Sequence, residues 1–148
     1  MKKHYDNPYR ERLRQKITHL SGQVFERKDL TQDQSNTEQL RLNRALNAFI
    51  DQGLVMKISH GLYAKAMPMT LANGQTRTVL QDSFESVAIE ALNKLGLQWE
   101  WGDAIQAYNR GETTQVPSRF SVKLHSRFRG SIQAEGRSVV FEGDINAR

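Results

Sequence analysis

The chain has 148 residues and no cysteine, which excludes disulfides, thiolate zinc sites and thiol nucleophiles, so its stability must come from packing. Its formal net charge is +5, and hydrophobic and charged residues make up 38% and 25% of the sequence, as in an ordinary globular chain. No apolar run approaches the roughly 20 residues of a membrane span, and the N-terminal segment lacks the apolar core of a signal peptide. We therefore expect a cytoplasmic protein of one or two small domains.

The first predicted helix begins at Asn7-Pro8, where a capping residue is followed by a proline whose backbone is preset for the first helical turn. Its apolar face comprises Tyr9, Leu13, Ile17 and Leu20, and its basic face comprises Arg10, Arg12, Arg14 and Lys16. Ser21-Gly22 ends this helix. The short apolar pair Val24-Phe25 is then predicted to join a later hairpin as a third strand, and residues 27–30 to begin a second helix.

Residues 36–52 predict a third helix, which is amphipathic. Asn36 and Gln39 have the spacing of a capping box, and Gly53 supplies the left-handed residue that ends a helix. The apolar stripe is Leu42, Ala45, Leu46, Phe49 and Ile50. A hairpin follows without a linker, with strands at 54–58 and 62–64 around a Ser59-His60-Gly61 turn. The order helix, strand, helix, turn, helix, strand, strand is that of a winged helix-turn-helix.

This order predicts a DNA-binding domain at residues 1–66. Those residues hold 12 Lys or Arg against 7 Asp or Glu, a net +5, whereas residues 67–148 hold 9 of each. In such domains the third helix enters the major groove and the hairpin, or wing, touches phosphates. The candidate DNA contacts are Thr37, Leu40, Arg41, Arg44 and Asn47 on the helix, and Lys57, His60, Tyr63 and Lys65 on the wing.

Other roles are open for several of these side chains. Arg41 and Arg44 are also compatible with simple solvated charges on a helix. Leu40 falls on the polar face, where it can meet a thymine methyl, a neighbouring protein surface or the second helix. Tyr63 can pack at the base of the wing instead of donating to a phosphate.

Residues 67–81 contain a proline and an Asn73-Gly74 turn without helical periodicity, and they predict a connector. Residues 82–148 predict a small α+β domain with an antiparallel sheet. Asp82 and Glu85 suit a capping box for a helix that ends at Gly96, and a short helix is expected within 103–108. Residues 119–125 alternate as in a strand, and two further strands are expected at 128–134 and 138–142 around a Glu135-Gly136 turn.

Two groups of side chains in the second half bear on function. Trp99 and Trp101 are expected to anchor its core. A basic group is the candidate partner surface, either for a protein or for nucleic acid: Arg119, Lys123, Arg127 and Arg129. A charged outer strand face that blocks edge pairing is the alternative reading of that group. The carboxylates lack the neighbouring groups of a catalytic set, so no enzyme activity, metal or cofactor is predicted.

Four segments together resemble the AbiEi-like antitoxins of type IV toxin–antitoxin systems: GQVFERKDL, NRALNAFIDQGLVMKISHGLYAK, FESVAIEALNKLG and TTQVPSRFSVKL. The resemblance runs from about residue 10 to residue 142, and the chain is similar to the short members. It implies a winged-helix domain that binds an operator and represses its own operon. It also implies a C-terminal domain that counteracts a cognate nucleotidyltransferase toxin.

The sequence thus predicts an antitoxin-like repressor, a monomer or homodimer that acts on double-stranded operator DNA and a nucleotidyltransferase toxin, with no membrane partner. Two other classes are also compatible with the residues. One is a protein-interaction module of a mobile element or phage, whose winged helix docks protein. The other is an RNA-binding regulator.

Overall fold

The computed structural model describes the backbone of residues 7–142 and the side chains of residues 8–142. The side chain of Asn7, predicted to cap the first helix, lies outside this part of the chain. The elements, in chain order, are α1 (Asn7–His19), β1 (Val24–Phe25), the 3₁₀ turn η2 (Arg27–Asp29), α2 (Asn36–Asp51), β2 (Val55–Ser59), β3 (Leu62–Thr70), β4 (Thr76–Leu80), α3 (Phe84–Lys94), β5 (Trp99–Trp101), α4 (Asp103–Asn109), β6 (Ser121–Leu124), β7 (Gln133–Ala134), β8 (Arg137–Ser138) and β9 (Val140–Glu142). The predicted α+β class is confirmed. None of the helices within residues 7–142 is long and apolar enough to cross a membrane.

The central sheet has the order β1-β3-β2, and β4 pairs with the second half of β3. All three pairings are antiparallel. Val24 lies opposite Ala64 and Phe25 opposite Tyr63, which confirms that the Val24-Phe25 pair joins the hairpin as a third strand.

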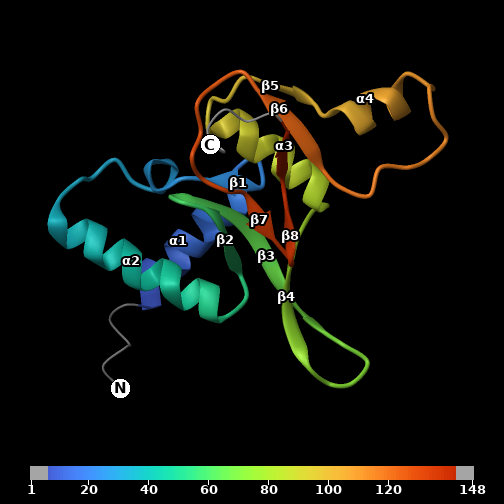
Figure 1. Ribbon diagram of the computed structural model, residues 1–148. Helices are drawn as coiled ribbons and strands as arrows, with labels where there is room; N and C mark the ends of the chain where they lie inside the picture. The colour runs from blue at the N-terminus through green and yellow to red at the C-terminus, as the bar shows by residue number, and fades with distance from the viewer. Residues whose placement is uncertain (1–6, 143–148) are drawn as a thin grey trace.

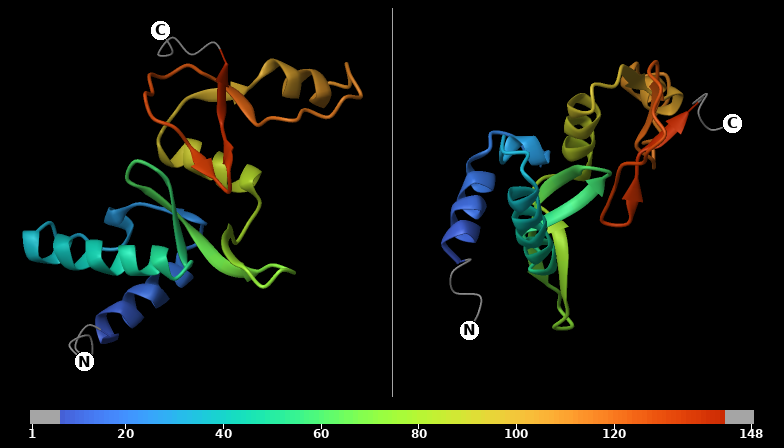
Figure 2. Two further views of the ribbon diagram at one scale, coloured as in Figure 1. Left: turned by 60° about the horizontal axis from the view of Figure 1, so that its bottom comes forward. Right: turned by 90° about the vertical axis from the view of Figure 1, so that its left-hand side faces the viewer.

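The two faces of this sheet carry different layers. α1 and α2 cover one face, and α3 with the C-terminal strands covers the other (Figures 1 and 2). Because side chains alternate along a strand, Tyr63 of β3 belongs to the core beneath α1 and α2, while Leu62 and Ala64 belong to the core beneath α3. One sheet therefore serves two hydrophobic cores.

The predicted connector at 67–81 is not a linker. Its residues form the second half of β3, a tight turn and β4, which are paired from Ala66–Leu80 to Thr70–Thr76. The proline and the Asn-Gly pair suggested a loop, but both suit a hairpin: Pro68 lies on the outer edge of β3, and Gly74 has the positive φ of 87° that a tight turn requires.

α2 is the helix predicted at 36–52, with small differences at its start. Ser35, not Asn36, is the N-cap, and its side chain accepts the N–H of Glu38 at 3.3 Å. At the other end Gly53 has φ 78°, and the N–H groups of Gly53 and Leu54 bond the carbonyls of Ile50 and Phe49. The predicted glycine stop is therefore confirmed, as a Schellman motif.

The predicted second helix is reduced to the single turn η2. The N–H of Glu26 bonds the Asp29 carboxylate at 2.8 Å, and a polar segment with no apolar stripe then leads directly to Ser35. Without an apolar face there is nothing to hold a longer helix against the core. The chain therefore has a single 3₁₀ turn at the position where a helix-turn-helix has the helix before its recognition helix.

In the second half, α3 is capped by Ser83, one residue after the predicted Asp82. β5 and β6 are antiparallel as expected, but β6 and β9 are parallel, because the chain reverses through the β7–β8 hairpin before it returns. The predicted strands at 128–134 and 138–142 are correspondingly shorter. Their Glu135-Gly136 turn is confirmed, with φ 57° and 76°.

Candidate nucleic-acid interface

The face of α2 that points away from the core carries four of the predicted contacts. Thr37, Leu40, Arg44 and Asn47 are all exposed, and their spacing puts them on one side of the helix. The Leu40 side chain is 48% exposed, so it does not pack against a second helix. Arg44 forms no hydrogen bond or ion pair with the residues that the structure describes. This face therefore offers one cation, one apolar side chain and two neutral polar groups to a partner.

Arg41 lies at the border of this face, where α2 approaches α1. Its guanidinium carbon lies 3.9 Å from the centre of the Tyr9 ring, a cation–π contact. The Tyr9 hydroxyl donates to Glu38 at 3.3 Å. Burial, together with the nearby Glu38 charge, raises the pKa of Tyr9, so this phenol stays a neutral donor. Arg41 is thus held in place by an interhelical contact.

A groove of about 430 Å³ lies between α1 and α2 beside Arg41. It is lined by Tyr9, Arg12, Leu13, Lys16, Leu30, Glu38 and Arg41. Three cations face one carboxylate there, an arrangement that suits a phosphate. The helical spacing of Arg12 and Lys16 was visible in the sequence, but their approach to Arg41 depends on how the two helices pack.

The predicted wing residues divide into two pairs. Lys57 and His60 are exposed, as a phosphate contact requires. Tyr63 is only 8% exposed and stacks on Phe25 with ring centres 5.7 Å apart, and Lys65 is only 7% exposed. The Lys65 ammonium donates to the carbonyls of Leu20 at 2.6 Å and Thr18 at 3.3 Å.

The prediction that Tyr63 and Lys65 contact DNA is therefore wrong. Both residues alternate onto the face of β3 that α1 and α2 cover, and there they pack or bond internally. The structure leaves Lys57 and His60 as the available wing contacts from the predicted set.

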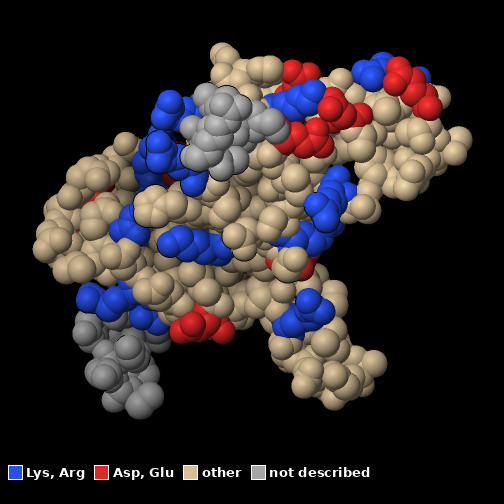
Figure 3. All heavy atoms as spheres, in the orientation of Figure 1, with Lys and Arg blue, Asp and Glu red and all other residues tan. Residues whose placement is uncertain are grey.

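Figure 3 shows how charge is distributed over one side of the molecule. Lysine and arginine side chains are spread across α1, α2 and the loop that precedes β7, whereas acidic side chains gather over β5, β6 and α4. Arg127 and Arg129, exposed on that loop, and Arg119, exposed just before β6, form no ion pair with other described residues. These three residues of the predicted partner surface are therefore accessible, and the surface itself stays a prediction.

Lys123 is the exception, because it pairs with Asp103 at 2.5 Å. The hydrogen bond to Asp103 raises the pKa of Lys123, although the side chain is partly exposed. This ion pair links α4 to β6, and the role of Lys123 in a partner surface stays a prediction.

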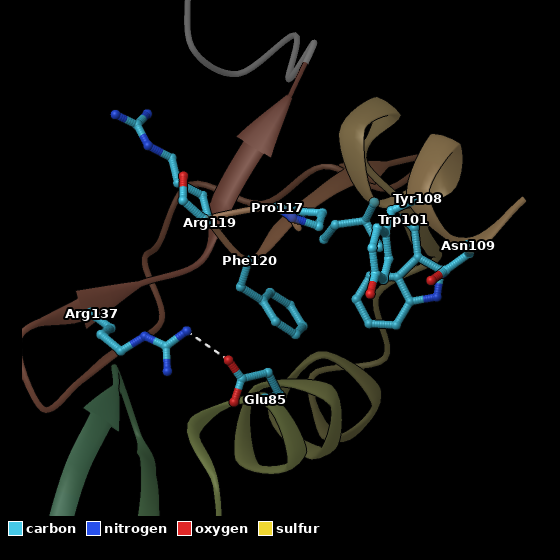
Figure 4. Close-up of a pocket in the computed structure, with 10 residues that line it drawn as sticks. Glu85, Trp101, Tyr108, Asn109, Pro117, Arg119, Phe120 and Arg137 are labelled. Atoms are coloured by element: carbon cyan, nitrogen blue, oxygen red, sulfur yellow. Dashed lines mark hydrogen bonds and ion pairs between the residues drawn. The ribbon is translucent and has the colours of Figure 1, made fainter. Parts of the chain in front are cut away.

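A second hollow, of about 240 Å³, lies in the C-terminal half. Figure 4 shows the rings of Trp101, Phe120 and Tyr108 around it, while Arg119 points away. The Glu85–Arg137 ion pair, at 2.6 Å, closes one side. The expected core role of the tryptophans holds in part: Trp99 and Trp101 are half-buried and contact each other edge to face, with ring centres 5.1 Å apart.

The carboxylates of the second half are engaged in structural contacts. Glu85 pairs with Arg137, Asp103 with Lys123 and Glu112 with Arg110. Glu90 accepts the backbone N–H groups of Gln23 and Val24 at 2.6–3.0 Å. Within residues 8–142 no group of three or more His, Asp or Glu side chains is placed to hold a metal ion.

Comparison with protein-family models, curated proteins and solved structures gives no match. Any functional assignment therefore rests on the geometry of the exposed face of α2, the basic groove beside it and the β2–β3 hairpin.

Proposed function

We propose that this chain is a sequence-reading DNA-binding regulator with a winged-helix N-terminal half, in which α2 enters the major groove. The observation that carries the proposal is the exposed face of α2, where Arg44 has no partner among residues 8–142 and the basic groove between α1 and α2 lies alongside. An unpaired arginine on an exposed helix can bond a guanine edge through two hydrogen bonds, and flanking cations can hold the phosphates.

Each exposed side chain on α2 has a matching role in this pose. Arg44 suits guanine, Asn47 suits adenine, and Leu40 suits the methyl group of thymine. The groove between α1 and α2 and the Lys57 and His60 side chains of the wing would contact backbone phosphates on either side of α2. Contacts to backbone phosphates position the protein on the DNA but do not read its sequence.

The resemblance to AbiEi-like antitoxins supports a more specific form of the proposal. The chain would repress its own operon, and its C-terminal half would counteract a cognate nucleotidyltransferase toxin. Arg119, Arg127 and Arg129 there are exposed and form no ion pair with other described residues, so they are available to a partner. Co-expression with a nucleotidyltransferase encoded beside it tests this form: growth arrest by the enzyme should be relieved by the full chain and should persist if the antitoxin assignment is wrong.

A mobility shift of the purified protein on its own promoter DNA tests the DNA-binding proposal. We expect a shift that survives excess scrambled duplex and weakens steeply as salt rises, because bound cations displace counterions from DNA. A salt-dependent shift on RNA but not on duplex DNA would replace the proposal with RNA binding. No specific shift on either would leave the α2 face, with its exposed Leu40, as a protein-docking surface.

A further inference from the structure

Two hollows adjoin in the C-terminal half. The hollow beside Trp101, of about 240 Å³, and a second one of about 260 Å³ share four lining residues: Ser118, Arg119, Phe120 and Arg137. Each is smaller than a typical small-molecule site, which measures about 300–1,000 Å³, but the two together fall within that range. Aromatic rings line the first hollow, and mainly arginine and serine side chains line the second. This double hollow therefore has an aromatic end and a basic end.

The aromatic end is preformed. The ring centre of Trp101 lies 5.1 Å from that of Trp99 and 5.3 Å from that of Phe120. Tyr108, on α4, is 41% exposed, and an ion pair joins α4 to β6. Figure 4 shows the rings of Trp101, Tyr108 and Phe120 grouped around the first hollow. Accessible aromatic rings held in this way stack on flat ring systems, and base–aromatic stacking is favourable for every nucleobase.

Glu85 and Asn109 add polar groups to the aromatic end. Arg137 donates to one oxygen of Glu85 at 2.6 Å, and this hydrogen bond lowers the pKa of the carboxyl, so Glu85 is ionised near neutral pH. An ionised carboxylate only accepts hydrogen bonds. A ligand in this hollow is therefore expected to carry N–H groups on its edge, as guanine does. An apolar side chain of a peptide has no such group.

The basic end has donors that lack partners. Arg119, which points away from the aromatic rings, is exposed, as are Ser118 and Ser138. The side chains of these three residues form no hydrogen bond or ion pair with other described residues. Guanidinium and hydroxyl groups are donors that suit a phosphate. The charged side chains that line the double hollow are Arg119, Arg137 and Glu85, so its net charge is positive and it favours an anion.

We propose that the double hollow binds a nucleotide, with the base against Trp101 and Tyr108 and the phosphate at Arg119 and Arg137. The two ends of the hollow match the two halves of such a ligand. Guanine is the preferred base, because its ring N–H and its amino group lie side by side and both can donate to Glu85. The same chemistry occurs in a free nucleoside monophosphate and at the 5′ end of a nucleic-acid strand. The site contains no residue of α2, so this inference does not depend on DNA binding.

Isothermal titration calorimetry of the full chain with guanosine monophosphate (GMP) tests the proposal. We expect GMP to bind, and guanosine and inorganic phosphate each to bind at least about tenfold more weakly, because each of them fills only one end of the double hollow. Tryptophan fluorescence locates the binding: GMP should quench it, since Trp101 lies in the wall of the site.

Two substitutions at exposed positions separate the two ends. Arg119→Gln should weaken GMP binding about tenfold or more and leave guanosine binding unchanged, because it removes a charged donor to the phosphate alone. Tyr108→Ala should weaken GMP and guanosine alike by a similar factor, whereas Tyr108→Phe keeps the ring and should bind as the wild type does. Arg77→Gln is the matched control, because it removes the same charge from an exposed side chain that lines neither hollow.

Three results would overturn the proposal: no binding of GMP, equal affinity for guanosine and GMP, or equal losses in Arg119→Gln and Arg77→Gln. Circular dichroism confirms that each variant is folded. A short 5′-phosphorylated RNA distinguishes the two sources of the ligand. Binding at least about tenfold tighter than that of GMP, and lost both without the 5′ phosphate and in Arg119→Gln, would assign the site to a strand end. RNA binding no tighter than that of GMP would assign it to the free nucleotide.

Discussion

Lys57 and Lys65 illustrate how burial decides the role of a residue. They lie on the paired strands β2 and β3, and their side chains point to the same side of the sheet. Lys57 is exposed beside α2, whereas the ammonium of Lys65 is enclosed beneath the end of α1, bonded to two carbonyls. A cation at that position compensates the unpaired carbonyls of a helix C-terminus.

Substituting the two lysines should therefore separate stability from DNA affinity. Lys65→Met keeps the apolar stem but leaves the partly buried carbonyls of Thr18 and Leu20 without this donor, and it should lower the free energy of unfolding by about 1–3 kcal/mol. Lys57→Ala should leave that free energy unchanged, weaken binding to all DNA sequences alike and reduce the salt slope by about 1. Urea denaturation and fluorescence anisotropy measure the two effects, and a loss of DNA affinity in folded Lys65→Met would contradict the assignment.

Asp29 gives the molecule an acid-sensitive contact. Burial alone would raise the pKa of this carboxyl, but the hydrogen bonds from Lys94 and the Glu26 N–H lower it below its usual value. A carboxyl whose pKa is lowered by folding stabilises the protein above its unfolded pKa of about 3.9. This contribution is lost as the pH falls through the lower, folded-state pKa.

The comparison of wild type with Asp29→Asn should show this dependence. The wild-type advantage in free energy of unfolding should be at most about 1 kcal/mol near neutral pH, because the ion pair with Lys94 is partly exposed. It should shrink toward zero as the pH falls to about 2. Urea denaturation at several pH values provides the measurement. A difference that stays constant through the acid range would show that the Asp29 charge contributes nothing.

At the scale of elements, the contact between α3 and β1 joins the two cores. Glu90 of α3 accepts N–H groups from Gln23 and Val24 at the outer edge of β1. The approach is close: a Cβ placed on Gly22 would lie 2.8 Å from the Glu90 carboxylate. A side chain at position 22 would therefore push the Glu90 carboxylate away from the N–H groups that it accepts.

Glu90→Ala should destabilise the protein by about 1–3 kcal/mol, because backbone donors at the α3–β1 contact lose their acceptor. Glu85→Ala serves as the control on the same helix, since its ion pair with Arg137 is half-exposed and should contribute at most about 1 kcal/mol. Thermal or urea unfolding measures both. Equal effects of the two substitutions would show that Glu90 does not hold the strand.

The elements that the sequence predicted well are those with local signals. The apolar stripe and the Gly53 stop are set by residues close in the chain, and the strand character of Val24-Phe25 is visible in the pair itself although its partner strand β3 is distant in sequence. The second helix was over-predicted, because the polar residues 31–35 provide no apolar face to hold a helix longer than the single turn η2. Glu90, the Arg41–Tyr9 contact and the burial of Lys65 depend on packing between elements distant in sequence, so no local pattern could indicate them.

At the scale of the whole molecule, the division at residue 66 does not separate two independent cores. The face of β1, β2 and β3 that lies beneath α3 includes Val24, Ile58, Leu62 and Ala64, which are all buried there. Cutting the chain at residue 66 would expose this face and also remove β4. The N-terminal half is therefore expected to need the C-terminal half for its own stability.

A fragment of residues 1–66 should accordingly fail to fold or should aggregate, because an exposed apolar sheet face is not stable in water. The full chain should unfold in a single cooperative transition that is the same by circular dichroism and by tryptophan fluorescence. Both tryptophans, Trp99 and Trp101, lie in the C-terminal half, so fluorescence reports on that half alone. Two separate transitions, or a folded fragment, would show that the halves are independent.

The central claim is that the exposed face of α2 reads DNA sequence, and the specificity ratio of Arg44→Ala tests it most directly. The ratio compares affinity for the protein's own promoter DNA with affinity for a scrambled duplex at one fixed salt concentration. The wild-type chain should favour the promoter by about a thousandfold or more, and Arg44→Ala should reduce that preference at a cost of about 1–3 kcal/mol while retaining non-specific binding. A ratio that is unchanged in Arg44→Ala, or close to one in the wild type, would contradict the account.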